Sequence, residues 1–461
     1  ETMEEEFSIH SNNESVEEVL NSYMSRRQMI VGGLAGAALS FMGGSKVSAL
    51  TSNAPQVAAA AKKAKIGFTS IPLQLGAMPT IAPEYDYSVL IPWREKLDGS
   101  GKSFDYAGFT AEDQAKSIGI GHDGICYFGD NKKGMLCINH EYGTTPHIMG
   151  KAVPASLDDV KLSQTAHGVS VVMIENTKTG WKMVKSTNNR RIHGNTAVKF
   201  SGPAAKSDML VNPAGNPMQG TLNNCANGET PWGTYLTCEE NFNGYFGTND
   251  KAWKPNTDQA RYGLSAAGFG YEWHKFDARF DLSNAGYVNE INRFGWVVEI
   301  DPNNPKQVPV KRTALGRIKH EGATVVEGKD GRAVVYMGDD ERFDYVYKFV
   351  SKDSWKKMIA AGKSPLDEGT LYVAKYNDNG TGEWLELSTK NPLLAGWSIE
   401  KILIQTRSAA DAVGATKMDR PEWVAAGPGG NMYVTLTNNT QRGTVGKASV
   451  NSAIPTSENS N

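Results

Sequence analysis

The most regular feature of the chain is a succession of short apolar runs separated by turn-forming residues. In several places two such runs flank a stretch of Gly, Asn, Asp or Lys, which is typical of two strands joined by a turn. Helical periodicity is confined to short pieces, mainly 353–361. The pattern therefore predicts an all-β protein with short helical insertions. Strands are expected at 124–128, 134–138, 169–174, 181–184, 323–326, 332–337, 345–350, 423–426 and 431–435.

Polar side chains of the kinds that bind metals follow the second strand of several of these units. They are Asn139-His140-Glu141, Glu239-Glu240-Asn241, Asp339-Asp340-Glu341 and Thr437-Asn438-Asn439. Strand units arranged radially would bring equivalent strand ends to one mouth of a central channel, so the repeat favours a β-propeller. A β-sandwich is the alternative, because its strand ends also cluster, although at less convergent points.

Carboxylates from several strands that meet at one site would repel each other unless cations neutralise them. The segment from Asn223 to Asn241 adds Cys225 to two consecutive carboxylates, Glu239 and Glu240. Oxygen ligands suit calcium, whereas a cysteine thiolate suits a transition metal. Each of these residues alone has a structural explanation, as a solvated strand end or a buried side chain, so the prediction of a mixed metal site rests on their joint pattern.

Several other classes of function are disfavoured. A zinc hydrolase is disfavoured because His320-Glu321-Gly322 lacks helical His spacing, and a serine hydrolase because no Gly-x-Ser-x-Gly motif occurs. Residues 427–430 precede a predicted strand, so they form a turn and not a phosphate-binding loop. The chain has 461 residues, 39% of them hydrophobic, and a formal net charge of -2, which indicates a globular protein without nucleic-acid binding.

The N-terminal region is expected to be an export signal. Arg26 and Arg27 precede a short, weakly apolar run from Val31 to Met42, and small residues follow at 47–49. This order is typical of a bacterial twin-arginine signal. The apolar run is shorter than the roughly 20 residues of a membrane span, so we expect no stable span. Residues 1–49 are thus assigned to a signal region, 50–65 to a linker and 66–461 to the catalytic domain.

The four cysteines have two possible uses besides metal binding. Cys126 and Cys137 lie on adjacent predicted strands, so a disulfide between them is possible in an oxidising compartment. We favour the simpler interpretation that both are buried apolar side chains.

Five segments together resemble the PhoX-type alkaline phosphatases. They are NNCANGETPWGTYLTCEENFNGYFG at 223–247, INHEY at 138–142, KHEGA at 319–323, GDDERFDYVYKF at 338–349 and RPEWVA at 420–425. The resemblance implies an exported phosphomonoesterase, folded as a β-propeller of six blades, with an iron (Fe³⁺) and calcium (Ca²⁺) centre that makes a protein nucleophile unnecessary. Its substrates would be small phosphate monoesters, its export partner the twin-arginine translocase, and its location periplasmic or secreted. We expect a monomer.

The resemblance also implies roles for individual residues. Cys225, Glu240 and Glu321 resemble the iron ligands, and Asp340, Glu422, Glu141 and Glu239 resemble carboxylates around calcium. Arg420 is expected to bind substrate phosphate, since a guanidinium matches phosphate oxygens; the alternative is an ion pair near Glu422. Because the family continues with further blade-forming sequence, the chain is expected to be truncated at its C-terminus.

Two rival functions remain open from the sequence. A calcium-dependent propeller lactonase or esterase needs a similar acidic mouth but no cysteine ligand. A non-catalytic propeller that binds a partner would leave the acidic strand ends without metal. Elemental analysis distinguishes the three readings: iron with calcium, calcium alone, or neither metal.

Overall fold

The computed structural model describes residues 71–72, 74–76 and 78–442. The predicted signal region, the linker and the arginine pair lie outside these residues. The chain divides into two compact units, of which the smaller holds the described residues up to Val89 together with Ala426–Tyr433. The larger unit spans Leu90–Ala425 and continues from Val434. It contains the predicted site residues.

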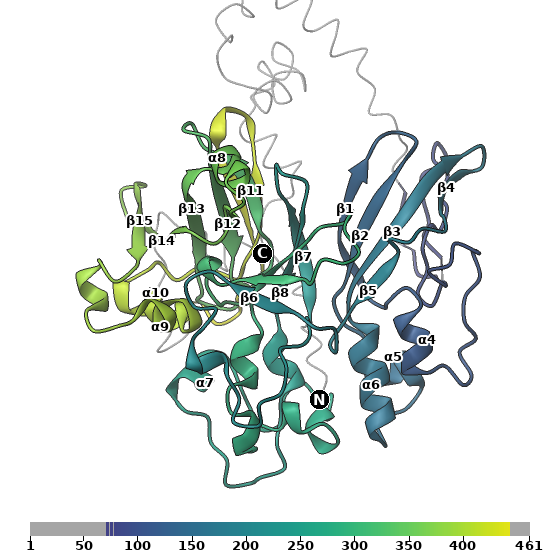
Figure 1. Cartoon of the computed structure of the whole chain (residues 1–461), viewed down its shortest axis with the longest axis horizontal. Coiled ribbons are helices and arrows are strands. Elements are labelled where there is room, and N and C mark those ends of the chain that lie inside the picture. The colour runs from purple at the N-terminus through teal and green to yellow at the C-terminus, as the bar shows by residue number, and fades with distance from the viewer. Residues whose placement is uncertain (1–70, 73, 77, 443–461) are drawn as a thin grey trace, which may run out of the picture. The chain divides into compact units, whose positions relative to one another are not determined.

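The larger unit is built mainly of antiparallel sheet (Figure 1). The first sheet has the order β1-β2-β3-β4, with β5 paired to β3, and the second has the order β6-β10-β9-β8-β7, in which β6 and β10 run parallel. The third is a meander in chain order, β11-β12-β13-β14-β15, and β16 pairs with β17.

The strands of the first sheet are β1 (His122–Gly129), β2 (Lys133–His140), β3 (Gly168–Thr177), β4 (Gly180–Met183) and β5 (Arg190–Ile192). Those of the second are β6 (Lys199–Ser201), β7 (Asn224–Glu229), β8 (Tyr235–Glu239), β9 (Val297–Ile300) and β10 (Val310–Arg312). The remaining strands are β11 (Thr324–Glu327), β12 (Arg332–Gly338), β13 (Val346–Ser354), β14 (Gly369–Tyr376), β15 (Gly382–Leu387), β16 (Pro421–Ala426) and β17 (Met432–Leu436).

The expected β-rich class is confirmed, and each predicted hairpin pairs as expected. The apolar faces of these strands form the cores: Leu236, Val335 and Phe349 are buried in one cluster, and Met135, Cys137 and Val171 in another. Cys126 and Cys137 lie directly opposite each other on β1 and β2, and both are free thiols. Cys137 is fully buried, as the preferred interpretation expected, whereas Cys126 is only half-buried and its Sγ lies 3.4 Å from Glu229 Oε2.

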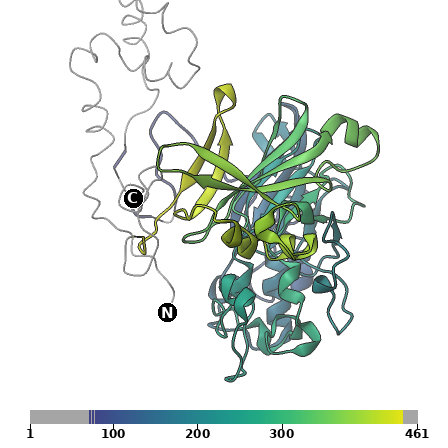
Figure 2. The same ribbon diagram turned by 90° about the vertical axis from the view of Figure 1, so that its left-hand side faces the viewer.

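Helices are more numerous than the sequence pattern predicted. The expected helix near 353–361 is α8 (Trp355–Ala360). The other described α-helices are α4 (Ala111–Ala115), α5 (Thr145–Met149), α6 (Leu157–Ala166), α7 (Thr257–Arg261), α9 (Ile399–Ile404) and α10 (Thr406–Val413). Serine caps were the overlooked signal, since Ser156 and Ser398 accept backbone N–H groups at the starts of α6 and α9. In both views α4, α5 and α6 lie toward the same end of the sheets as the irregular segment that follows α7 (Figures 1 and 2). Among the described residues, no helix combines the length and apolarity that a bilayer crossing demands.

Candidate metal centre

A thiol and four carboxylates converge where strands of the first, second and third sheets approach each other. The possible ligand atoms of Cys225, Glu240 and Glu321 lie within 4.8 Å of one another, and so do those of Asp123, Glu141 and Cys225. Cys225 belongs to both groups. Its Sγ atom is 3.2 Å from Asp123 Oδ2 and 3.2 Å from Glu321 Oε1. We call these five residues the Cys225 cluster.

Two irregular strands aim side chains at this cluster. The register of β1 against β2 shifts between His122 and Ile125, and that of β7 against β8 shifts between Asn224 and Asn227. Such bulges redirect the side chains next to them, here Asp123 and Cys225. The β7 strand, which carries Cys225, contacts β1, β2 and β11, and so lies between the sheets that supply the other ligand atoms.

Hydrogen bonds fix the backbone around Cys225. The amide of Asn139, a buried residue of β2, donates to the carbonyl oxygens of Cys225 (2.6 Å) and Ala226 (3.0 Å). The Ala226 N–H donates in turn to the carbonyl of Glu321 at 2.9 Å. These bonds tie the backbone at Cys225 and Ala226 to β2 and to the segment that carries Glu321, which sets the thiol relative to that segment.

Further backbone bonds join the ends of β8 and β12 to the segment that carries Glu321. His320 N–H donates to Glu239 O at 2.9 Å, and Glu321 N–H donates to Gly338 O at 3.1 Å. Asp340 N–H donates to Lys319 O at 3.2 Å. The polar ends of β8 and β12, which carry Glu240 and Asp340, are therefore neighbours in space, as the sequence pattern suggested. His320 itself is fully buried, and burial lowers its pKa to about 4, so it is a neutral structural side chain.

Three carboxyl groups of the cluster, those of Glu141, Glu240 and Glu321, have raised pKa values. Burial, followed by repulsion from Asp123, raises the pKa of Glu141 to about 8. Burial and the charges of Asp340 and Glu422 raise the pKa of Glu321 to about 8. Burial and the charges of Glu321, Asp340 and Glu141 raise the pKa of Glu240 well above its usual range. The pKa of the Cys225 thiol is also raised, first by burial and then by Glu240 and Glu321.

These residues fit a bound cation. A desolvated group of carboxylates and a thiol is stable in ionised form only when positive charge compensates it, and the ligand atoms here already converge on common points. The thiol suits a transition metal, and the surrounding oxygens suit a hard cation. Lys319 opposes the rise in the pKa of Glu240, but it is one positive charge among several carboxylates.

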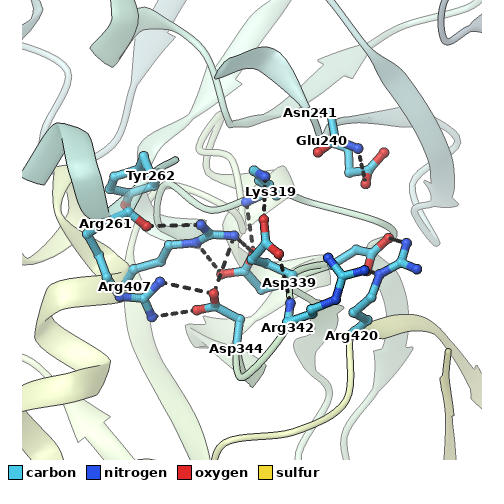
Figure 3. A network of polar contacts seen from close by, with 12 residues as sticks. Glu240, Asn241, Arg261, Tyr262, Lys319, Asp339, Arg342, Asp344, Arg407 and Arg420 are labelled. Atoms are coloured by element: carbon cyan, nitrogen blue, oxygen red, sulfur yellow. Dashed lines mark hydrogen bonds and ion pairs between the residues drawn. The ribbon is translucent and has the colours of Figure 1, made fainter. Parts of the chain in front are cut away.

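Arg420 lies at the edge of the cluster and is paired with a predicted ligand. Its Nε and Nη2 atoms are 2.9 Å and 3.0 Å from the two oxygens of Asp340, a bidentate ion pair (Figure 3). The alternative that an ion pair occupies Arg420 is thus realised, with Asp340 as the partner. Glu422 is close enough for its charge to act on Glu321.

Glu239 does not join the cluster. Its carboxylate is fully buried, accepts from Lys311 Nζ at 2.7 Å, and also accepts from the backbone N–H groups of Gly295 and Trp296. Consecutive residues at a strand end point to opposite sides, so Glu239 faces away when Glu240 faces the cluster. The expectation of Glu239 as a calcium-site carboxylate therefore disagrees with the structure, in which its oxygens are already satisfied.

Two residues at the site were missed in the sequence. Asp123 stands at the beginning of β1, whereas the polar groups that drew attention stand at strand ends; the His122-Asp123-Gly124 sequence just before an apolar run was the available signal. Trp423 is half-exposed, and its Nε1 donates to Glu321 Oε1 at 3.2 Å. It lies within the RPEWVA segment but had been given no role.

Comparison with known proteins places the chain in a family. A family model described as alkaline phosphatase PhoX matches residues 66–461. A solved structure of Pseudomonas fluorescens PhoX in complex with vanadate, a transition state analogue, is 43% identical, with a TM-score of 0.77; the match covers 83% of this chain and 70% of that chain. A search of curated proteins found no match. The resemblance carried by the five sequence segments is thereby confirmed, and the chain belongs to the PhoX family of alkaline phosphatases.

Proposed function

We propose that the protein hydrolyses small phosphate monoesters to inorganic phosphate at the Cys225 cluster. The observation that carries the proposal is the convergence of Cys225, Glu240 and Glu321 in a member of a phosphatase family. The similar Pseudomonas fluorescens protein binds vanadate, an analogue of the transition state, which supports phosphoryl transfer as the reaction.

The donor atoms support a division of the metals. Cys225, Glu240 and Glu321 would hold Fe³⁺, because a thiolate with two carboxylates suits a Lewis-acidic transition metal. Asp123, Glu141, Asp340 and Glu422 would hold Ca²⁺ through oxygen. When bound, these cations neutralise phosphoryl oxygens and stabilise the leaving alkoxide. Glu239 is left out of this set because Lys311 and two backbone N–H groups engage it.

Arg420 is proposed to orient the phosphoryl group. Its planar guanidinium offers two parallel N–H donors, and these match phosphate oxygens as well as they match Asp340. Once Asp340 pairs with a cation, its hold on the guanidinium weakens, and the same two donors can turn to a phosphate. The carboxylates would hold the cations, and Arg420 would orient the phosphoryl group through its two parallel donors.

The wider architecture is also a proposal. Three five-stranded sheets with converging strand ends support a β-propeller as the arrangement of the catalytic domain at 66–461. We propose that the protein acts as a monomer. The arginine pair supports export by the twin-arginine translocase to the periplasm or beyond. Retention of the precursor in the cytoplasm after exchange of Arg26 and Arg27 for lysine tests this route.

The Cys225→Ser variant tests the metal centre. Serine keeps the size of the side chain but replaces a soft donor with a poor one. If the thiolate binds iron, the pure protein is coloured by charge transfer, and colour, iron content and hydrolysis of phosphate monoesters fall together in the variant while the far-UV spectrum stays unchanged.

The matched control is Cys126→Ser, since Cys126 is also partly buried and near a carboxylate, Glu229, yet lies outside the cluster. This variant is expected to keep its colour and activity. Full iron content and activity in Cys225→Ser would show that the thiol is structural. A wild-type protein with calcium alone would favour a propeller lactonase or esterase, and one with neither metal a binding module.

A further inference from the structure

A buried ladder of alternating acids and arginines runs up to the candidate metal centre (Figure 3). Arg407 Nε and Nη2 lie 2.8 Å and 2.5 Å from the two oxygens of Asp339, and both side chains are almost completely buried. Asp344, the next rung, lies 3.7 Å from Arg407 and is bound by two nitrogens of Arg261 at 2.6 Å and 3.0 Å. Arg261 also binds Asp411 at the exposed end. We call Asp339, Arg407, Asp344, Arg261 and Asp411 the acid–arginine ladder.

The inner end of the ladder holds two segments of backbone together. Asp339 Oδ1 accepts from Lys319 N–H at 3.2 Å, while Asp340 N–H donates to Lys319 O at 3.2 Å. His320 and Asp339 form an antiparallel bridge between the same two segments. One segment carries Glu321 and the other carries Asp340. The Asp339 carboxylate is therefore located at the crossing point of the two segments that present these side chains.

Asp339 cannot itself be a ligand in this arrangement. Both of its oxygens are bound by Arg407, and its side chain is inaccessible to solvent. Arg407 belongs to α10, and one of its Nη atoms also donates to the carbonyl of Arg261 at 3.3 Å. The position of Asp339 is thus fixed from the helix side.

A buried ion pair of this kind is weak support for stability, because its desolvation offsets most of the attraction between the charges. Its benefit must be sought in the geometry that it imposes. Glu321 and Asp340 are acidic side chains on adjacent segments, and their ionised forms repel each other, so the spacing of the two segments needs a restraint. Groups behind metal ligands that fix their orientation commonly change metal affinity by about 10- to 100-fold when removed.

We propose that Asp339 and Arg407 are positioning residues, which hold Glu321 and Asp340 at the separation that the metal centre requires. The inference rests on the proposed function, because it assumes that these carboxylates bind metal. It assigns a purpose to α10, which approaches the centre through Arg407. It also predicts that damage to the ladder loosens metal binding before it unfolds the protein.

The test compares Asp339→Asn with wild type by titration of calcium into chelator-treated protein, read by thermal stabilisation and by activity. Asparagine keeps the shape of the side chain but removes the charge that pairs with Arg407. We expect the calcium concentration for half-maximal effect to rise by about tenfold or more, with kcat recovering at high calcium. Arg407→Lys keeps the charge but loses the bidentate contact with Asp339, so it should also raise the calcium concentration for half-maximal effect. It replaces Asp339→Asn in the test if that variant does not fold.

Glu290→Gln is the matched control. Glu290 is fully buried and pairs with Arg279 and Arg293, but it does not touch the segments that carry Glu321 and Asp340. It should lower the melting temperature without moving the calcium midpoint. An unchanged midpoint in both ladder variants, beside a calcium-responsive wild type, would overturn the inference alone. A wild-type protein that binds no calcium would overturn the proposed metal centre and the inference with it.

Discussion

Two strained backbone positions lie beside the Cys225 cluster. Asn223 and Arg420 are two of the few described non-glycine residues with positive φ, at 50° and 48°. A positive φ costs a residue such as arginine about 1–3 kcal/mol, so it persists only where the surrounding contacts impose this conformation. For Arg420 the bidentate contact with Asp340 does so, and Pro421 follows directly in β16. The conformation places the guanidinium beside the cluster, which is consistent with a functional position for Arg420.

Trp423 offers a separate test at the residue scale. Its indole N–H is a directional donor to Glu321, and a hydrogen bond to a charged group contributes about 1.5–3 kcal/mol when buried and less at a half-exposed side chain. Trp423→Phe keeps the aromatic ring but removes the donor. We expect kcat/KM for a phosphate monoester to fall by about three- to tenfold, with weaker iron retention on dialysis.

Trp355→Phe is the control for this change. Trp355 makes the same kind of contact, from Nε1 to Glu327 at 2.7 Å, outside the Cys225 cluster. Equal losses of iron in the two variants would mean that the effect comes from general destabilisation, and unchanged kinetics in Trp423→Phe would remove the tryptophan from the site.

The residues that sequence alone predicted were those with an unusual chemical neighbourhood. Cys225 and Glu240 stood out because soft and hard donors share one short segment, and the structure brings both together with Glu321. Glu239 looked equivalent to Glu240, and only the direction of each side chain at the strand end distinguishes them. Asp123 had no such local signal, because its approach to Cys225 is produced by pairing between segments about a hundred residues apart.

At the scale of elements, strands were easier to predict than their irregularities. Apolar runs located the hairpins, since alternation and turn residues act locally. The bulges that redirect Asp123 and Cys225 depend on the partner strand, so the sequence of one strand does not reveal them. The helix α10 was missed for a similar reason. From the sequence, Arg407 would be expected at the surface, and its burial is explained only by its ion pair with Asp339.

The close approach of β12 to β16 leads to a prediction at this scale. A Cβ atom on Gly338 would lie 2.2 Å from the carbonyl oxygen of Glu422 and 2.6 Å from that of Pro421. Gly338→Ala must therefore push apart the segments that carry Asp340 and Glu422. We expect a loss of about 1–3 kcal/mol in the free energy of unfolding, measured by denaturant titration, and weaker calcium binding.

Gly322→Ala is the matched substitution. It adjoins Glu321, but its nearest neighbour would be Ala226 Cβ at an ordinary 3.7 Å, so an added methyl group fits. This variant should keep its stability and its metals. If Gly338→Ala bound calcium as tightly as Gly322→Ala, the spacing of β12 and β16 would be irrelevant to the centre.

At the scale of the whole molecule, the centre depends on three sheets at once. Asp123 and Glu141 come from the first, Cys225 and Glu240 from the second, and Glu321 precedes the third. Association of these segments brings ionisable groups into a buried site, so folding and proton binding are coupled. The stability of the metal-free protein must then depend on pH in a way that bound cations alter.

The direction of this dependence follows from the raised pKa values of the cluster. Glu141 and Glu321 have a pKa of about 8 in the folded protein, against an ordinary value of 4.5, so the folded state binds more protons than the unfolded state between these limits. Their protonated forms stabilise the fold fully below about pH 4.5, and that contribution is lost as pH rises through about 8. The buried Glu240 shifts in the same direction. The pKa of Glu341 is lowered to about 2, because Lys319 and Arg407 outweigh its burial, and its contribution is lost only as the pH falls below about 4.5.

We therefore expect the melting temperature of chelator-treated protein to fall as pH rises from about 6 to about 8.5. The free energy of unfolding should fall over the same range, by at most about 1.4 kcal/mol per pH unit for each carboxyl group. Addition of calcium and iron should remove the decline, since cations replace the protons and favour the ionised carboxylates. Differential scanning calorimetry of the metal-free and the reconstituted protein across this range measures both curves. Metal binding at about pH 7 should also release protons, detectable in weakly buffered solution. A metal-free protein that becomes more stable toward pH 8.5 would show that these carboxyl groups are not brought together in the folded molecule.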